Sequence, residues 1–111
     1  MKRYVPERGD AAWLTLRPSE RHEQTGRRPV LVLSPRAYNE RTGLAIVCPM
    51  TSRVKGYPFE VQSVLAGRAG AVLADHVRSV DWVARDAKRA GRLPPQIVER
   101  VAAIVAKLIG A

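Results

Sequence analysis

Apolar residues recur in short clusters along the chain up to about residue 83, and segments that favour turns, among them residues 39–43 and 66–70, separate the clusters. In one cluster Leu14 and Leu16 alternate with Trp13 and Thr15, as expected for a half-buried strand. Residues 30–33 are apolar at every position, which predicts a central strand covered on both faces. Short strands in close succession favour a β-sandwich or a β-barrel. The predicted strands lie near residues 13–16, 30–33, 44–48, 57–61, 71–77 and 79–83.

After residue 93 the spacing of apolar residues becomes that of a helix. Pro94 and Pro95 suit a first helical turn, and Gly110 suits the position after a helix. We therefore predict one amphipathic helix, which either packs deeply on the strands or shares in a subunit interface. The charged residues 85–92 before it are predicted to form a solvated loop. The wide apolar face of the helix comprises Ile97, Val98, Val101, Ala102, Ile104, Val105, Leu108 and Ile109.

The chain has 111 residues, enough for one domain with a modest core, so residues 1–111 are expected to form a single domain. Its net charge is +9, and 15 of its 19 basic residues are arginine, which favours a polyanionic partner. Only 5% of the residues are aromatic, too few for a long platform that stacks bases.

Cysteine and hydropathy exclude several other classes of protein. Cys48 is the only cysteine, so an intrachain disulfide and a cysteine-rich zinc site are both excluded. The N-terminal segment is charged, and the longest apolar stretch, residues 101–106, is far shorter than the roughly 18 residues of a membrane span. We expect a cytoplasmic protein that is neither exported nor embedded in a membrane.

The densest polar segment, residues 20–28, precedes the apolar strand at residues 30–33. In it Gly26 permits a bend that would bring Glu23 and Arg28 over one pocket, where a carboxylate can take a proton and an arginine can bind a phosphate. Taken alone, a charged surface loop without function is the favoured interpretation.

A further polar segment, residues 51–56, follows the apolar strand at residues 44–48. Its hydroxyls, cations and glycine suit either a phosphate-binding loop or a plain hairpin turn. It lacks the glycine spacing of a Walker A loop, so nucleotide hydrolysis has no support.

The histidines and carboxylates are too scattered to define a site by themselves. His22 and His76 lie in separate segments, so a mechanism that uses two histidines is neither supported nor excluded. No paired-acid or HExxH motif is present, and we expect no metal and no cofactor. Asp75 suits either a structural ion pair with Arg78, or an acceptor for base edges, or a group that orients an arginine.

Together, four segments resemble the MazF/PemK family of toxins from bacterial toxin–antitoxin modules. They are RGDAAWLTLRP, EQTGRRPVLVLSP, VCPMTSRVKGYPFEV and GAVLADHVRSVDW, in family order and spacing, and the resemblance runs from about Tyr4 to Gly110. It implies a mainly β fold with helices, in which a small barrel like that of Src-homology-3 domains carries a C-terminal amphipathic helix. Members of the family are homodimeric endoribonucleases that cut single-stranded RNA at short motifs without a metal ion and shut down translation. An acidic antitoxin of the MazE kind holds them inactive.

The resemblance also implies roles for individual residues. The catalytic arginine of the family falls on Arg28, its threonine on Thr51 and its acid on Glu23. A ribose 2′-hydroxyl would attack the adjacent phosphorus, leaving a 2′,3′-cyclic phosphate and a 5′-hydroxyl. Glu23 would be the base, and Thr51 would hold a phosphoryl oxygen. Arg28 would stabilise the negative charge that develops on the phosphorane.

The group that protonates the leaving oxygen is not identified, because an arginine with a pKa above ~12 is a poor proton donor. Water or His22 could do so. His76 stands where relatives often carry glutamine, so this protein could prefer a different RNA sequence from theirs. We predict that Arg27, Arg53 and Lys55 contact phosphates, and that Ser52, Asp75 and Arg78 contact bases. The alternative function is a non-catalytic poison like the CcdB toxins, or a barrel that only binds nucleic acid.

Overall fold

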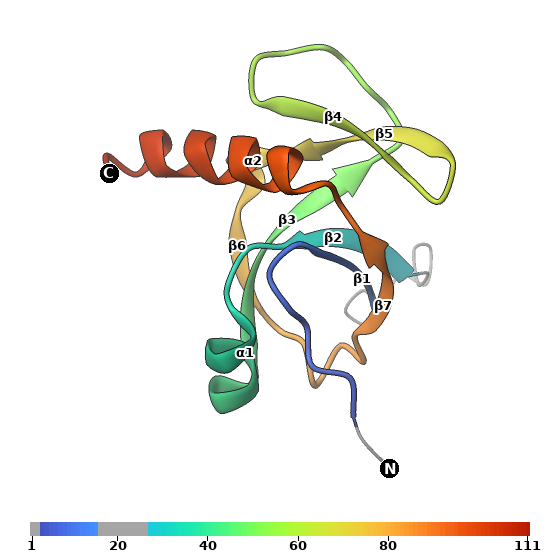
Figure 1. Ribbon diagram of the computed structural model, residues 1–111, viewed down its shortest axis with the longest axis vertical. Coiled ribbons are helices and arrows are strands. Elements are labelled where there is room, and N and C mark those ends of the chain that lie inside the picture. The colour runs from blue at the N-terminus through green and yellow to red at the C-terminus, as the bar shows by residue number, and fades with distance from the viewer. Residues whose placement is uncertain (1–2, 16–26) are drawn as a thin grey trace, which may run out of the picture.

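A computed structural model describes residues 3–15 and 27–111 (Figure 1). Its strands form one curled antiparallel sheet in the order β4-β5-β3-β2-β1-β7, and β6 pairs with β3. The strands are β1 (Asp10–Thr15), β2 (Arg27–Val32), β3 (Leu44–Thr51), β4 (Glu60–Leu65), β5 (Arg68–Leu73), β6 (Arg78–Asp81) and β7 (Lys88–Arg92). The helices are α1 (Arg36–Thr42), the short 3-10 helix η1 (Ala74–His76) and α2 (Pro95–Leu108).

Strand β3 lies at the centre of the sheet and causes it to curl. One edge of β3 pairs with β2, whereas the other edge pairs with β6 over residues 44–47 and with β5 at Met50 and Thr51. Because neighbouring residues of a strand point to opposite faces, β1 and β2 contribute to two cores. Ala12 and Val32 pack inside the barrel, whereas Ala11 and Leu31 pack on the face that α2 covers. The predicted barrel with a C-terminal helix is therefore confirmed.

The predicted central strand is present within β2, and Val30, Leu31 and Val32 are buried as expected. The strand predicted at residues 57–61 begins only at Glu60 and continues to Leu65. The segment predicted at residues 71–77 is split, because β5 ends at Leu73 and η1 follows.

Two elements were missed by the prediction. Residues 39–43 were interpreted as a turn, but residues 39–42 belong to α1, and Gly43 caps the helix in the left-handed conformation (φ 75°). The predicted solvated loop is also wrong in part, because residues 88–92 form β7, which pairs with β1. Lys88, Arg89 and Arg92 are exposed there, and charged residues are common on edge strands, where they discourage further pairing. An apolar pattern therefore could not reveal this strand.

Helix α2 covers the outer core with its first turns only. Val98 and Val101 are buried, and Ile97, Ile104 and Val105 pack against the same core. Further along, Leu108 is 47% exposed, and Ile109, just after the helix, is 72% exposed. Both interpretations of the wide apolar face therefore retain support: its start packs deeply, and its end remains uncovered. Within residues 3–15 and 27–111, no helix is long and apolar enough to cross a membrane.

Candidate active site

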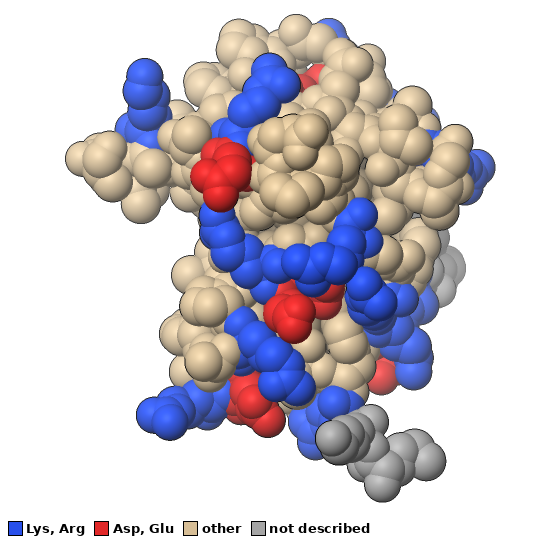
Figure 2. Space-filling view, in the orientation of Figure 1, with Lys and Arg blue, Asp and Glu red and all other residues tan. Residues whose placement is uncertain are grey.

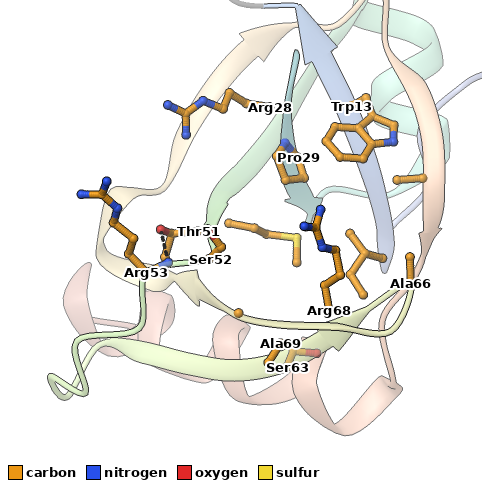
Figure 3. Close-up of a pocket in the computed structure, with 14 residues that line it drawn as sticks. Trp13, Arg28, Pro29, Thr51, Ser52, Arg53, Ser63, Ala66, Arg68 and Ala69 are labelled. Carbon is orange, nitrogen blue, oxygen red and sulfur yellow. Dashed lines mark hydrogen bonds between the residues drawn. The ribbon is translucent and has the colours of Figure 1, made fainter. Parts of the chain in front are cut away.

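A pocket of about 1130 Å³ opens beside the ends of β2 and β3 and the β4–β5 hairpin (Figure 3). The sequence-predicted residues Arg28, Thr51, Ser52 and Arg53 all line it. The other lining residues are Trp13, Pro29, Met50, Ser63, Leu65, Ala66, Arg68, Ala69, Gly70 and Ala90.

The register of the sheet brings Arg28 and Thr51 together. Val30 pairs with Pro49 in the antiparallel β2–β3 ladder, and continuing this register by two residues places Arg28 opposite Thr51. Side chains that face each other across antiparallel strands lie within reach of one another. Arg28 is exposed at the start of β2, and Thr51 is half-buried at the end of β3. One rigid sheet therefore positions both side chains.

Thr51 Oγ1 also organises the turn that follows β3. The backbone N–H of Arg53 donates a hydrogen bond to this oxygen (3.0 Å). Because Oγ1 accepts in that bond, the hydroxyl proton can still be donated to a ligand in the pocket. A phosphoryl oxygen is a ligand that this proton and the neighbouring arginines would bind.

Gly70 allows β5 to approach Thr51 closely. A Cβ atom at this position would lie 2.5 Å from the carbonyl oxygen of Thr51, closer than real contacts allow. A glycine here thus sets the position of Thr51 against the hairpin.

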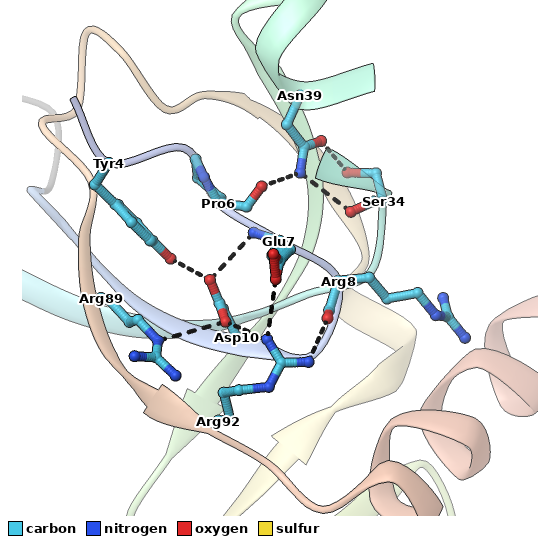
Figure 4. A network of polar contacts seen from close by, with 9 residues as sticks. All are labelled: Tyr4, Pro6, Glu7, Arg8, Asp10, Ser34, Asn39, Arg89 and Arg92. Atoms are coloured by element: carbon cyan, nitrogen blue, oxygen red, sulfur yellow. Dashed lines mark hydrogen bonds and ion pairs between the residues drawn. The ribbon is translucent and has the colours of Figure 1, made fainter. Parts of the chain in front are cut away.

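Three arginines border the pocket without an acidic partner: in the described parts of the chain, no carboxylate pairs with Arg28, Arg53 or Arg68. Paired arginines lie elsewhere. Figure 4 shows the buried Asp10 carboxylate with Arg92, whose Nη1 lies 2.7 Å from Oδ1. The pocket is therefore lined by three arginines and by no carboxylate of the described residues.

Arg27, which was predicted to contact phosphate, does not line the pocket. Its guanidinium donates hydrogen bonds to Thr15 Oγ1 (2.6 Å) and to the backbone oxygens of Trp13 (3.0 Å) and Asp86 (2.6 Å). These bonds tie the start of β2 to β1 and to the segment before β7. The structure thus gives Arg27 a structural role beside the pocket.

The loop between β3 and β4 carries Lys55, which also lies outside the pocket lining. The Glu60 carboxylate accepts hydrogen bonds from the backbone N–H groups of Lys55 (3.0 Å) and Gly56 (2.8 Å). The Tyr57 hydroxyl donates to Asp75 (3.1 Å). Partial burial and the Asp75 carboxylate raise the pKa of Tyr57 above its ordinary value. These hydrogen bonds hold residues 55–57 of the loop against Glu60 and Asp75.

Asp75 and Arg78, predicted to contact bases, do not line the pocket either. Asp75 lies in η1, where it contacts Tyr57 and His76 (3.8 Å) rather than Arg78, so the predicted ion pair is not formed. Arg78 is exposed at the start of β6.

Two further predictions, Glu23 and His22, lie outside the described residues. Among the residues that the structure describes, no group of three or more His, Cys, Asp or Glu side chains could hold a metal ion.

Sequence reasoning missed Trp13 and Arg68, both of which line the pocket. Trp13 was assigned to an alternating strand, and Arg68 to a turn. Their convergence depends on how β5 folds over the end of β3, which no local pattern shows.

Comparisons with known proteins show what the whole chain is similar to. Residues 7–109 match the family described as PemK-like, MazF-like toxin of type II toxin-antitoxin system. The chain is 45% identical over 112 residues to the endoribonuclease toxin MazF of Escherichia coli K12, covering 99% of each protein. It is 38% identical over 100 residues to endoribonuclease PemK of Escherichia coli, covering 86% of this chain and 75% of that protein. A crystal structure of MazE-MazF from Deinococcus radiodurans matches with a TM-score of 0.90 and 50% identity, covering 97% of this chain and 98% of that one.

Proposed function

The chain belongs to the PemK-like, MazF-like toxins of type II toxin–antitoxin systems and is an endoribonuclease, and we propose that it cleaves single-stranded RNA in the pocket beside Arg28 and Thr51. One observation carries the assignment of the site. Arg28, Arg53 and Arg68 line an open pocket without acidic partners in the described chain, next to the Thr51 hydroxyl. Such a pocket suits a phosphodiester, which binds through charge-assisted hydrogen bonds.

The chemistry proposed for this pocket transfers a phosphoryl group within the RNA. The ribose 2′-oxygen forms a bond to the adjacent phosphorus, and the bond from phosphorus to the 5′-oxygen breaks. The products are a 2′,3′-cyclic phosphate and a 5′-hydroxyl. Glu23 takes the proton from the 2′-hydroxyl, and water or His22 protonates the leaving oxygen.

Arg28 and Thr51 act on the charge that develops in this step. The phosphorane carries more negative charge on its oxygens than the ground state does, so a guanidinium and a hydroxyl placed beside it lower the barrier. One such donor contributes ~3–4 kcal/mol in other oxyanion sites, which predicts a roughly 100- to 1000-fold loss of kcat in Arg28→Ala.

Partners follow from charge and from uncovered apolar surface. The net charge of +9 suits both an RNA substrate and an acidic antitoxin of the MazE kind, which would obstruct the pocket. Leu44 and Ile46 of β3 and the end of α2 are exposed, and apolar surface of this kind favours a homodimer. We place the protein in the cytoplasm as a single domain over residues 1–111 that inhibits translation.

The test is cleavage of a long, mixed-sequence single-stranded RNA by the purified protein in excess EDTA. The proposal expects discrete fragments with 5′-hydroxyl ends from the wild type, and the same fragments formed roughly 100- to 1000-fold more slowly by a folded Arg28→Ala variant. Arg100→Ala is a control matched in charge, because Arg100 is exposed on α2 and does not line the pocket. Intact RNA from the folded wild type would instead favour a non-catalytic poison like the CcdB toxins.

A further inference from the structure

The pocket extends well beyond Arg28 and Thr51, and this second part has a different chemistry. Its lining is largely apolar there, formed by the side chains of Trp13, Pro29, Met50, Leu65 and Ala90. A phosphate alone needs no such surface, because its oxygens are bound by polar and charged groups. An apolar recess beside a phosphate site suits the planar part of a nucleotide.

Trp13 gives this recess an aromatic surface. Its neighbours Ala12 and Leu14 point into the barrel core, so the alternation along β1 turns the indole to the opposite face, across from Pro29. Trp13 is 37% exposed, whereas the other tryptophan, Trp82, is 4% exposed. A large ring that remains accessible in a pocket is available to a ligand.

Arg68 provides a cation at the same recess. It is the first residue of β5, directly after the turn in which Ala66 and Gly67 have positive φ (53° and 79°). Figure 3 shows its side chain extending from β5 toward Pro29. It is exposed, and over residues 3–15 and 27–111 no carboxylate pairs with it.

We propose that Trp13 and Arg68 form a nucleobase subsite, in which the base next to the scissile phosphate stacks on the indole and Arg68 binds the edge of that base. The proposal rests on the proposed function and deepens it, because it assigns part of the sequence preference to residues outside the Arg28–Thr51 pair. Single-stranded RNA is read in this way elsewhere, by stacking of splayed bases on aromatic rings and by hydrogen bonds to their edges.

The first test is the cleavage motif of each variant on a mixed-sequence RNA. Loss of base stacking costs ~1–3 kcal/mol, so Trp13→Ala should raise KM roughly 5- to 100-fold and lose the preference at one motif position, while Trp13→Phe retains that preference. Arg68→Ala should relax the same position. A phosphate contact behaves differently, so Arg53→Ala should weaken cleavage of all sequences alike. Arg100→Ala, which removes an equal charge, should leave motif and KM unchanged.

The second test measures the indole directly. The probe is an RNA that carries the mapped cleavage motif with a 2′-deoxyribose at the scissile nucleotide, so that it binds without reacting. Stacking should quench the fluorescence of Trp13, and Trp13→Phe should abolish the quench because the buried Trp82 remains as the only other tryptophan.

The outcomes separate the subsite from the function on which it rests. If the wild type cuts RNA but Trp13→Ala and Arg68→Ala cut the same motif with unchanged KM, the subsite is refuted and the endoribonuclease stands. Arg68 is exposed, so its variant tests the subsite even if Trp13→Ala does not fold. If the folded wild type cuts no RNA, the proposed function and the subsite fail together.

Discussion

Gly70→Ala offers a sharp test of how the fold positions Thr51. Gly70 lies on β5 beside the end of β3, where Thr51 pairs with Ala71. Its φ is not positive, so alanine can adopt this backbone conformation without strain. The only obstacle to the added methyl group is the neighbouring backbone, because the new carbon would lie 2.5 Å from the carbonyl oxygen of Thr51.

The size of the effect follows from this distance. Ordinary contact begins at 3.4 Å, so Thr51 and β5 must separate by about 0.9 Å. Overpacking of this kind typically costs ~1–3 kcal/mol of the free energy of unfolding. Misplacement of a catalytic group by ~1 Å can lower the rate about 100-fold. We therefore expect a folded but less stable variant whose kcat is about 100-fold lower.

The assay is single-turnover cleavage of an RNA with the mapped motif, together with urea unfolding. Gly91→Ala is the matched control, because Gly91 also lacks a positive φ and its added methyl group would meet only the flexible end of Leu65 at 3.2 Å. It should retain most of the activity. A Gly70→Ala variant with wild-type kcat would refute the view that Thr51 must be held at this position.

Three other expectations concern the loop and the buried groups. Glu60→Ala removes the acceptor for the backbone N–H of Lys55, so KM for RNA should rise roughly 3- to 10-fold with little change in kcat. Glu60→Gln should raise KM less, because its amide oxygen still accepts this hydrogen bond. Burial and the hydrogen bond to Asp10 raise the pKa of Tyr4 above its ordinary value of 10.0, so the folded state holds this proton more tightly. The free energy of unfolding should then be constant below about pH 10 and fall above it, measured as the difference between wild type and Tyr4→Phe, and an equal pH dependence of the two would contradict this. Burial raises the pKa of Cys48 to about 12, so iodoacetamide at pH 8 should alkylate it only after unfolding, and rapid labelling of the native protein would contradict its burial.

The sequence predicted those parts of the fold that depend on local apolar patterns. Residues 30–32 are apolar and buried at every position, and α2 begins at Pro95, as the two prolines indicated. The missed strand β7 has mostly charged residues because its outer edge faces solvent, so its pairing with β1 follows from the whole sheet and not from its own sequence. Helix α1 was hidden by residues 39–43, which are typical of turns. Asparagine is typical of turns, but Asn39 is buried in this helix, where its Nδ2 donates to the backbone oxygens of Pro6 (2.8 Å) and Ser34 (3.1 Å).

The candidate site was predictable where a resemblance marked it and not elsewhere. Arg28 and Thr51 were expected from two separate motifs, and both line one pocket because β2 and β3 are neighbours in the sheet. Trp13 and Arg68 are 55 positions apart along the chain and converge only because the β4–β5 hairpin lies against the end of β3. For Arg27 the structure adds a role that the sequence did not indicate, because its guanidinium bonds Thr15 and the backbone oxygen of Asp86, while its contact to phosphate stays a prediction.

Some arginines of the described chain pair with carboxylates, whereas the three that line the pocket do not. On the face seen in Figure 2, basic and acidic side chains lie side by side. Buried Asp10 binds Arg92, and Asp86 lies near Arg27 (3.7 Å). In contrast, no acidic residue lines the pocket within the described chain. An arginine held by a carboxylate must give up that partner before it can bind a phosphate, whereas the pocket arginines need not. Arg92 and Arg27 therefore stabilise the barrel, and the pocket arginines, which no described carboxylate holds, are the ones that the proposed RNA site uses.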